Sequence, residues 1–111
     1  MIKKATGSRG SWFATVDGEL LPCVHEYWWV KRDKTRRYDD RLLTSSRQSG
    51  ELVAAIKEKR RVILTKDKPY SPENPAPFTR TGYIALWTVE DIEFDENGLR
   101  FRFVDRECEL E

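Results

Sequence analysis

The dipeptide Asn97-Gly98 separates two stretches in which apolar and charged residues alternate, IEFDE and LRFRF. Asn-Gly favours a two-residue type I′ turn, because both central positions of that turn need a positive φ. The turn predicts a hairpin in which Phe94 faces Phe101 and Ile92 faces Phe103. All four side chains then share one face, which we expect to be buried.

The charged residues of the same hairpin support this register. Glu93 would face Arg102 and Asp95 would face Arg100, so opposite charges pair on the solvent side. Closer to the N-terminus, the apolar residues change parity. That change predicts a β-bulge near Glu90-Asp91, where one extra residue shifts the pairing.

A second hairpin is predicted near the N-terminus around Asp17-Gly18. Its strands would be Ser11–Val16 and Glu19–Val30, with Ala14 opposite Leu21. The second strand is apolar or aromatic at both parities. We therefore expect it to be covered on both faces, as in a small barrel or under a helix.

One helix is predicted between the hairpins, with Ser49 as its N-cap. Its apolar face would carry Leu52, Val53 and Ile56, and a short strand, Val62–Thr65, would follow. The polar residues 31–48 and the proline-rich residues 67–80 are expected to form loops. The predicted fold is therefore α+β: a small, curved, mostly antiparallel β-barrel or sheet with one main helix.

The chain has 111 residues, of which 39% are hydrophobic and 12% aromatic. This size and composition predict a single domain over residues 1–111. No apolar run approaches ~18 residues, so we expect no membrane partner. The first residues lack the apolar core of a signal peptide, and Cys23 and Cys108 are too few for a disulfide framework. A cytoplasmic protein with reduced thiols is expected.

The net charge of +1 conceals an uneven distribution. Residues 31–68 hold thirteen Lys and Arg against six Asp and Glu, a net of +7. Residues 90–111 hold nine acids against three arginines, a net of −6. Such asymmetry fits a polyanion partner, and it also fits two charged surfaces that attract each other within the fold.

The stretch VHEYWWVKRDKTRRYDDR, residues 24–41, places aromatic residues directly before a basic run. Basic grooves with aromatic platforms bind single-stranded nucleic acid, because every base has a π-face. The expected nucleic-acid-binding residues are Tyr27, Trp29, Lys31, Arg32, Arg36, Arg37, Tyr38, Arg60 and Arg61. Alternatively, Trp28 and Trp29 belong to the core. Since neighbours on a strand point in opposite directions, we expect at least one of them to be buried.

No cofactor and no metal site are expected. Cys23 and His25 are metal-ligand types on one strand face, but a zinc site needs three or four ligands. A Cys–His nucleophilic pair is also disfavoured, because residues two apart on a strand are ~7 Å apart.

The sequence favours a non-enzymatic protein that binds RNA or DNA. A protein-interaction or accessory module is the alternative. A small enzyme built on Cys23, His25 and acidic residues is the third possibility. The oligomeric state is left open.

The segment RTGYIALWTVEDIEFDENGLRFRF, residues 80–103, is similar to the central strands of PUA-like domains, including the EVE and ASCH branches. The resemblance spans roughly residues 51–104. It implies a small barrel that binds RNA or modified DNA bases through an aromatic pocket and a basic surface. It is a resemblance of pattern and assigns no binding residue.

Overall fold

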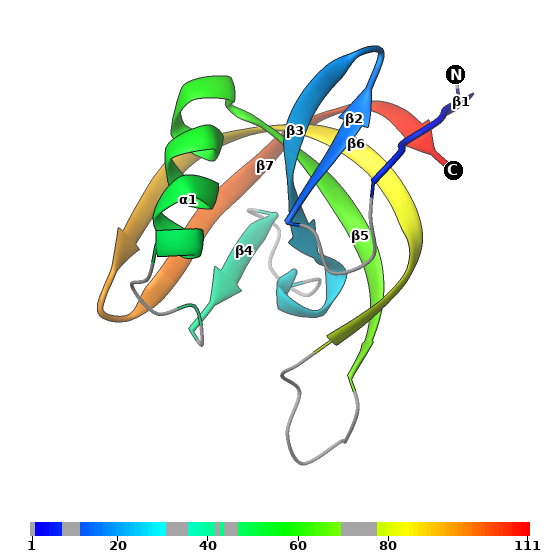
Figure 1. Ribbon diagram of the computed structural model, residues 1–111. Helices are drawn as coiled ribbons and strands as arrows, with labels where there is room; N and C mark the ends of the chain where they lie inside the picture. The colour runs from blue at the N-terminus through cyan, green and yellow to red at the C-terminus, as the bar shows by residue number, and fades with distance from the viewer. Residues whose placement is uncertain (1, 8–11, 31–35, 42, 44–46, 70–77) are drawn as a thin grey trace.

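The computed structural model describes residues 2–7, 12–30, 36–41, 43, 47–69 and 78–111 (Figure 1). Its elements are β1 (Ile2–Lys3), β2 (Phe13–Val16), β3 (Glu19–His25), the 3₁₀ turn η1 (Glu26–Trp28), β4 (Arg37–Asp40), α1 (Arg47–Lys59), β5 (Arg61–Pro69), β6 (Phe78–Asp95) and β7 (Gly98–Leu110). The strands form a nearly closed, barrel-like sheet with one helix. The predicted fold class is confirmed.

The sheet runs in the order β1-β7-β6-β5-β3-β2, and β4 pairs with β7 outside this path. The β1–β7 and β3–β5 pairs are parallel. The other pairs are antiparallel.

Two single β-bridges bring the ends of this path together. Thr6 pairs with Thr15, which joins the chain after β1 to β2. Trp29 pairs with Tyr38, which joins the chain after η1 to β4. Both β1 and β4 pair with β7. The first bridge therefore connects β2 to the β7 side of the sheet, and the second connects the chain that follows β3 to the same side. The sheet therefore curls into a barrel.

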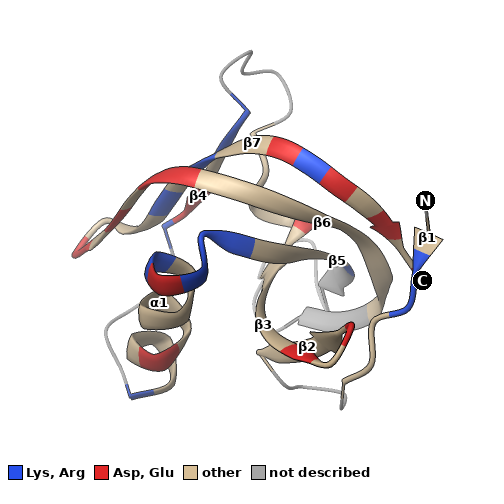
Figure 2. Cartoon of the chain, turned by 90° about the horizontal axis from the view of Figure 1, so that it is seen from above, with Lys and Arg blue, Asp and Glu red and all other residues tan. Residues whose placement is uncertain are grey.

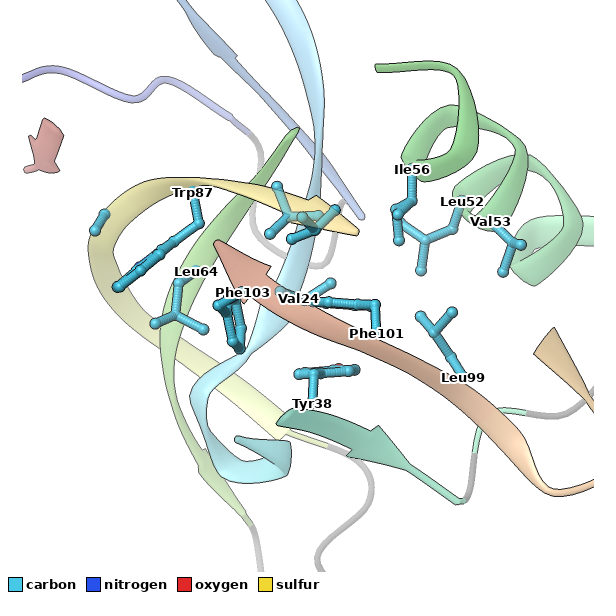
Figure 3. Packing of buried hydrophobic residues seen from close by; sticks show 13 residues of the cluster. Val24, Tyr38, Leu52, Val53, Ile56, Leu64, Trp87, Leu99, Phe101 and Phe103 are labelled. Atoms are coloured by element: carbon cyan, nitrogen blue, oxygen red, sulfur yellow. The ribbon is translucent and has the colours of Figure 1, made fainter. Parts of the chain in front are cut away.

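Buried side chains form two clusters, and alternate residues of β5 divide between them. Val62 and Leu64 belong to the larger cluster, which Figure 3 shows beneath the helix, whereas Ile63 belongs to the smaller one. Strands covered on both faces read as continuous apolar runs, which explains the sequence VIL at this point. The helix contributes to the larger cluster the three residues predicted for its apolar face, Leu52, Val53 and Ile56.

The helix begins earlier than predicted. Ser49 is buried inside the helix, which starts at Arg47, so the prediction of Ser49 as N-cap is wrong. The helix ends before Arg60, which adopts a left-handed φ of 52° and donates its N–H to the carbonyl of Ile56 at 2.8 Å. In the part of the chain that the structure describes, no helix has the length and apolar character needed to cross a bilayer.

The N-terminal hairpin has the predicted register. Ala14 pairs with Leu21, and both Asp17 and Gly18 have positive φ, as a type I′ turn requires. The second strand, however, ends at His25 and not at Val30. The 3₁₀ turn η1 follows, so strand parity does not govern the directions of Trp28 and Trp29.

The C-terminal hairpin has the predicted apolar face but different partners. Phe94 pairs with Leu99, and Phe103 pairs with Val89, so the predicted Phe94–Phe101 and Ile92–Phe103 pairs are wrong. The positive φ lies on Gly98 alone, and the N–H of Asn97 donates to the Asp95 carboxylate at 2.8 Å. Because Asp95 pairs with Gly98, the central residues of the turn are Glu96 and Asn97; neither has a positive φ, so the turn is not type I′. The register differs from the predicted one by two residues, which leaves each side chain on its predicted face.

The predicted bulge is confirmed. The register shifts between Glu90 and Glu93, and Asp91 has a φ of 56°. On the solvent side Asp95 faces Gly98 and Glu93 faces Arg100, so both predicted charge pairings are wrong, although Arg100 still donates to Asp95 diagonally at 2.7 Å. Arg100, and not Arg102, donates a hydrogen bond to the Glu93 carboxylate, with 3.1 Å between Nη2 and Oε2.

Both segments expected to form loops contain strands. Residues 37–40 form β4, and the β5–β6 ladder extends to the pair Pro69–Phe78. Residues 31–35 and 70–77 lie outside the described residues.

We predict that Gly98→Ala lowers the free energy of unfolding by about 2 kcal/mol or more. A Cβ at this position would lie 1.9 Å from the carbonyl oxygen of Asp40, and the φ of 98° disfavours any side chain. Gly50→Ala is the matched control, because nothing lies within 4 Å of a Cβ at that helical position. The control should gain about 0.5–1 kcal/mol in urea unfolding. Equal stability of the two variants would contradict the close approach at Gly98.

We also predict that Asp95 contributes stability that is lost in acid. Hydrogen bonds from Arg100 and from the Asn97 N–H lower the pKa of Asp95 from 3.8 to about 2. Because the folded-state pKa is the lower one, the contribution is complete above pH 3.8 and disappears as the pH falls toward 2. Between about pH 5 and about pH 2, Asp95→Asn should therefore lose less unfolding free energy than the wild type.

Candidate nucleic-acid interface

Two short chain segments, residues 29–30 after η1 and residues 36–38 at the start of β4, pair with each other, and we call them the neck. The Val30 N–H donates to the Arg37 carbonyl at 2.8 Å, next to the Trp29–Tyr38 bridge. The Phe103 N–H donates to the Arg36 carbonyl at 2.9 Å, which ties the neck to β7. The chain that connects the two sides of the neck carries the sequence KRDKT, residues 31–35. Lys31 and Arg32 lie outside the described residues, so the structure does not place these two expected binding residues.

Trp29 is partly buried and packs on the core beneath the neck. Its ring lies 5.4 Å from that of Trp87, edge-on, and 4.7 Å from that of Phe103. Trp28 is also partly buried against the larger cluster. Both tryptophans therefore contribute to packing, which was the alternative to a binding role.

Tyr27 is the most exposed aromatic side chain among the described residues, at 49%. It lies in η1, and the ring of Trp28 meets it edge-on at 5.0 Å. A tyrosine side chain that is half exposed can stack on a planar ligand.

Arg36 is exposed, and its side chain makes two contacts that hold the chain where it re-enters the neck. Its Nη1 donates to the Val104 carbonyl at 2.9 Å, and its guanidinium carbon lies 5.8 Å from the ring centroid of Trp87. The backbone φ is 57°, an uncommon value for a residue with a side chain. A cation–π contact of this kind stabilises by about 0.5–1 kcal/mol at an exposed site.

Tyr38 does not belong to the interface, contrary to the prediction. Its exposure is 1%, and its ring stacks on that of Phe101 with centroids 4.5 Å apart (Figure 3). The cause is the strand β4, in which alternate residues point to opposite faces. Tyr38 points into the core, whereas its exposed neighbour Arg37 points to solvent.

Arg61 is not brought together with Tyr27 and Trp29, and Arg60 is the residue that ends the helix. Arg61 alternates with Val62, which shares the larger cluster with Trp87, so the Arg61 side chain leaves the opposite face of β5. There it bonds to Glu107 at 2.8 Å and to Glu19. These partners raise the pKa of Arg61, with the Glu107 hydrogen bond as the largest cause. A guanidinium that already carries two carboxylates is a poor phosphate ligand.

These ion pairs show where part of the uneven charge is used. Figure 2 shows the basic start of β5 and the acidic residues near the end of β7. The Arg61–Glu107 pair joins the basic middle of the sequence to its acidic end. Part of the asymmetry therefore serves attraction within the fold, which was the alternative to a polyanion partner.

The residues proposed for a small enzyme line one cavity of about 40 Å³. Cys23, His25 and Asp40 contribute its polar groups, and the rest of its wall is formed by Trp12, Tyr38, Leu43, Leu52 and Leu99. That space suits a few water molecules, because ligand pockets are roughly 300–1,000 Å³. Sequence reasoning missed Asp40, which only the β4–β7 pairing brings near β3. Among the described residues, no three His, Cys, Asp or Glu side chains are grouped to hold a metal ion.

No protein-family profile matches the chain, and neither a curated protein nor a solved structure matches it significantly.

The packing predicts different costs for two aromatic truncations. Trp29→Ala should lower the unfolding free energy by about 2–3 kcal/mol, because it removes contacts with two core rings. Tyr27→Ala should change it by no more than about 0.5–1 kcal/mol, because half of that side chain is exposed. Urea unfolding of the two variants measures the difference. A larger loss for Tyr27→Ala would show that η1 is held by Tyr27 and not by Trp29.

Proposed function

We propose that this protein binds single-stranded nucleic acid at the neck end of its barrel. The observation that supports this most is the place of Tyr27, an exposed aromatic side chain directly before the neck. The chain across the neck is basic in sequence, and the exposed side chains of Arg36 and Arg37 stand where it returns. Aromatic stacking and phosphate neutralisation would then occur on one surface.

In this proposal Tyr27 replaces Trp29 as the principal stacking residue. Base–aromatic stacking needs an open ring face, and is worth about 1–3 kcal/mol per base. Trp29 instead positions η1, because its ring is engaged by Trp87 and Phe103. Besides its place on the basic surface, Arg36 helps to fix the other side of the neck through its contacts with Val104 and Trp87.

The PUA-like pattern of residues 51–104 leads to the same expectation and is part of the proposal. A cytoplasmic location is also proposed, since Cys23 and Cys108 are buried and form no disulfide. Neither point is needed for the binding experiment.

A protein partner is the second candidate, and one observation favours it. Val30, at 38% exposure, lies on the same neck as the exposed Tyr27, so an apolar contact with another chain could form there. A protein partner would not require the basic residues of the neck. Salt dependence therefore separates the two candidates.

We predict that Tyr27→Ala weakens binding of labelled oligothymidylate and oligouridylate by about 5- to 150-fold, the loss of one stacking contact. The salt dependence should stay unchanged, because no phosphate contact is removed. Fluorescence anisotropy at low salt measures both quantities. Tyr27→Phe should retain binding, and Leu20→Ala, which truncates another exposed apolar residue, should have no effect.

Absence of wild-type binding to either oligonucleotide at ~0.1 mM would exclude the nucleic-acid function, because non-specific binders reach this affinity. Binding that is insensitive to salt, or equal in Tyr27→Ala and wild type, would exclude the stacking role of Tyr27.

A further inference from the structure

Strand β4 carries a second feature beside the neck. Its residues alternate strictly: Tyr38 and Asp40 are buried, whereas Arg37 and Asp39 lie on the outer face, in register with Arg102 and Arg100 of β7. Arg37 and Arg102 are thus direct cross-strand neighbours with the same charge, an arrangement that destabilises a sheet. The outer face of β4 therefore carries positive charge that strand pairing does not explain.

Two arginines converge on a single atom of this face. The Arg37 Nη2 lies 3.1 Å from Asp39 Oδ2, and the Arg41 Nε lies 3.3 Å from the same oxygen. Four residues along a strand span ~13 Å, so the two side chains must lean toward each other to meet over Asp39. The carboxylate holds two guanidinium groups side by side.

The three members of this cluster differ in solvent exposure and in unused bonding capacity. The Asp39 side chain is only 8% exposed, while those of Arg37 and Arg41 are 47% and 77% exposed. Asp39 Oδ1 is buried and accepts no hydrogen bond from the described residues. A buried carboxylate with an unused oxygen and two exposed partners is poorly designed for stability alone.

Each arginine has five N–H donors, and only one donor of each is engaged by Asp39. The remaining donors border a hollow of about 400 Å³, lined by Arg37, Asp39, Arg41, Glu96, Asn97 and Arg100. Arg100 is already bonded to Asp95 and Glu93. The donors open to a ligand are therefore those of Arg37 and Arg41.

We infer that Arg37 and Arg41 form one phosphate-binding site, held in place by Asp39. Planar guanidinium forks match the oxygens of a phosphate, and Arg37, Arg41 and Asp39 together carry a net charge of +1. Of the other charged residues that line the hollow, Arg100 is positive and Glu96 is negative. The ligand group is a backbone phosphate of the strand that contacts Tyr27, so the inference rests on the proposed function. The Val30–Arg37 hydrogen bond joins the site directly to the neck.

The test uses two probes, inorganic tripolyphosphate and labelled oligothymidylate, with the full chain. Arg41→Ala and Arg37→Lys should each weaken tripolyphosphate binding about tenfold. The lysine variant keeps the charge beside Asp39 and removes the fork, so the fold is preserved. Arg47→Ala is the matched control, because Arg47 is 94% exposed and has one carboxylate partner, Glu51, on the helix. It should change binding less than about twofold.

The double variant distinguishes one shared site from two separate ones. If a single phosphate contacts both arginines, Arg37→Lys with Arg41→Ala should lose less than the product of the two single losses. For oligothymidylate, Arg41→Ala should also reduce the salt slope by ~0.7, whereas Tyr27→Ala should not.

Equal effects of Arg41→Ala and Arg47→Ala on both probes would overturn the phosphate site and leave the Tyr27 result untouched. Multiplicative losses in the double variant would overturn the shared site. A tripolyphosphate effect together with no oligothymidylate binding would retain the anion site and reject the nucleic-acid source of its phosphate. Binding of neither probe by the wild type would reject both proposals.

Discussion

Strand β7 is the element on which closure of the barrel depends. It pairs with β6 along one edge and with β4 and β1 along the other. The neck is connected to the sheet through β4, and β4 is fixed by its pairing with β7 and by the stack of Tyr38 on Phe101. Loss of that pairing would release the neck, the support of Trp29 and the outer arginines together. The candidate interface is therefore a consequence of how the sheet closes.

Alternate residues of β4 point to opposite faces of the sheet, so the strand contributes both to the core and to the surface. Its inward residues complete the core, and its outward residues place Arg37 and Asp39 beside the neck. A tyrosine in the middle of a basic run cannot both stack in the core and remain open to a base. The stacking role is therefore proposed for Tyr27, which lies on the 3₁₀ turn and belongs to neither buried cluster.

Electrostatics separates the basic residues into two groups. Arg61 and Lys59 both form ion pairs with Glu19, and Arg61 forms a second ion pair with Glu107. The positive charges of Arg61 and Lys59 are therefore neutralised by carboxylates within the fold. Exposed pairs of this kind add little stability, about 0–1 kcal/mol each. Arg37 and Arg41 share a single carboxylate and keep most of their donors unused. The basic middle of the sequence is therefore partly structural, whereas Arg37 and Arg41 lie at the neck.

The sequence by itself determined the fold class, both hairpins, the apolar face of the helix and the bulge near Asp91. These are local features, because turn residues and apolar periodicity act over a few positions. It did not determine the partners within the second hairpin, because a shift by two residues keeps every side chain on its face. Nor could it find β4, whose four residues carry three charges and one aromatic ring. Only pairing with β7, about sixty residues later, makes that segment a strand. That pairing decides that Tyr38 is core and that Arg37 and Arg41 meet over Asp39.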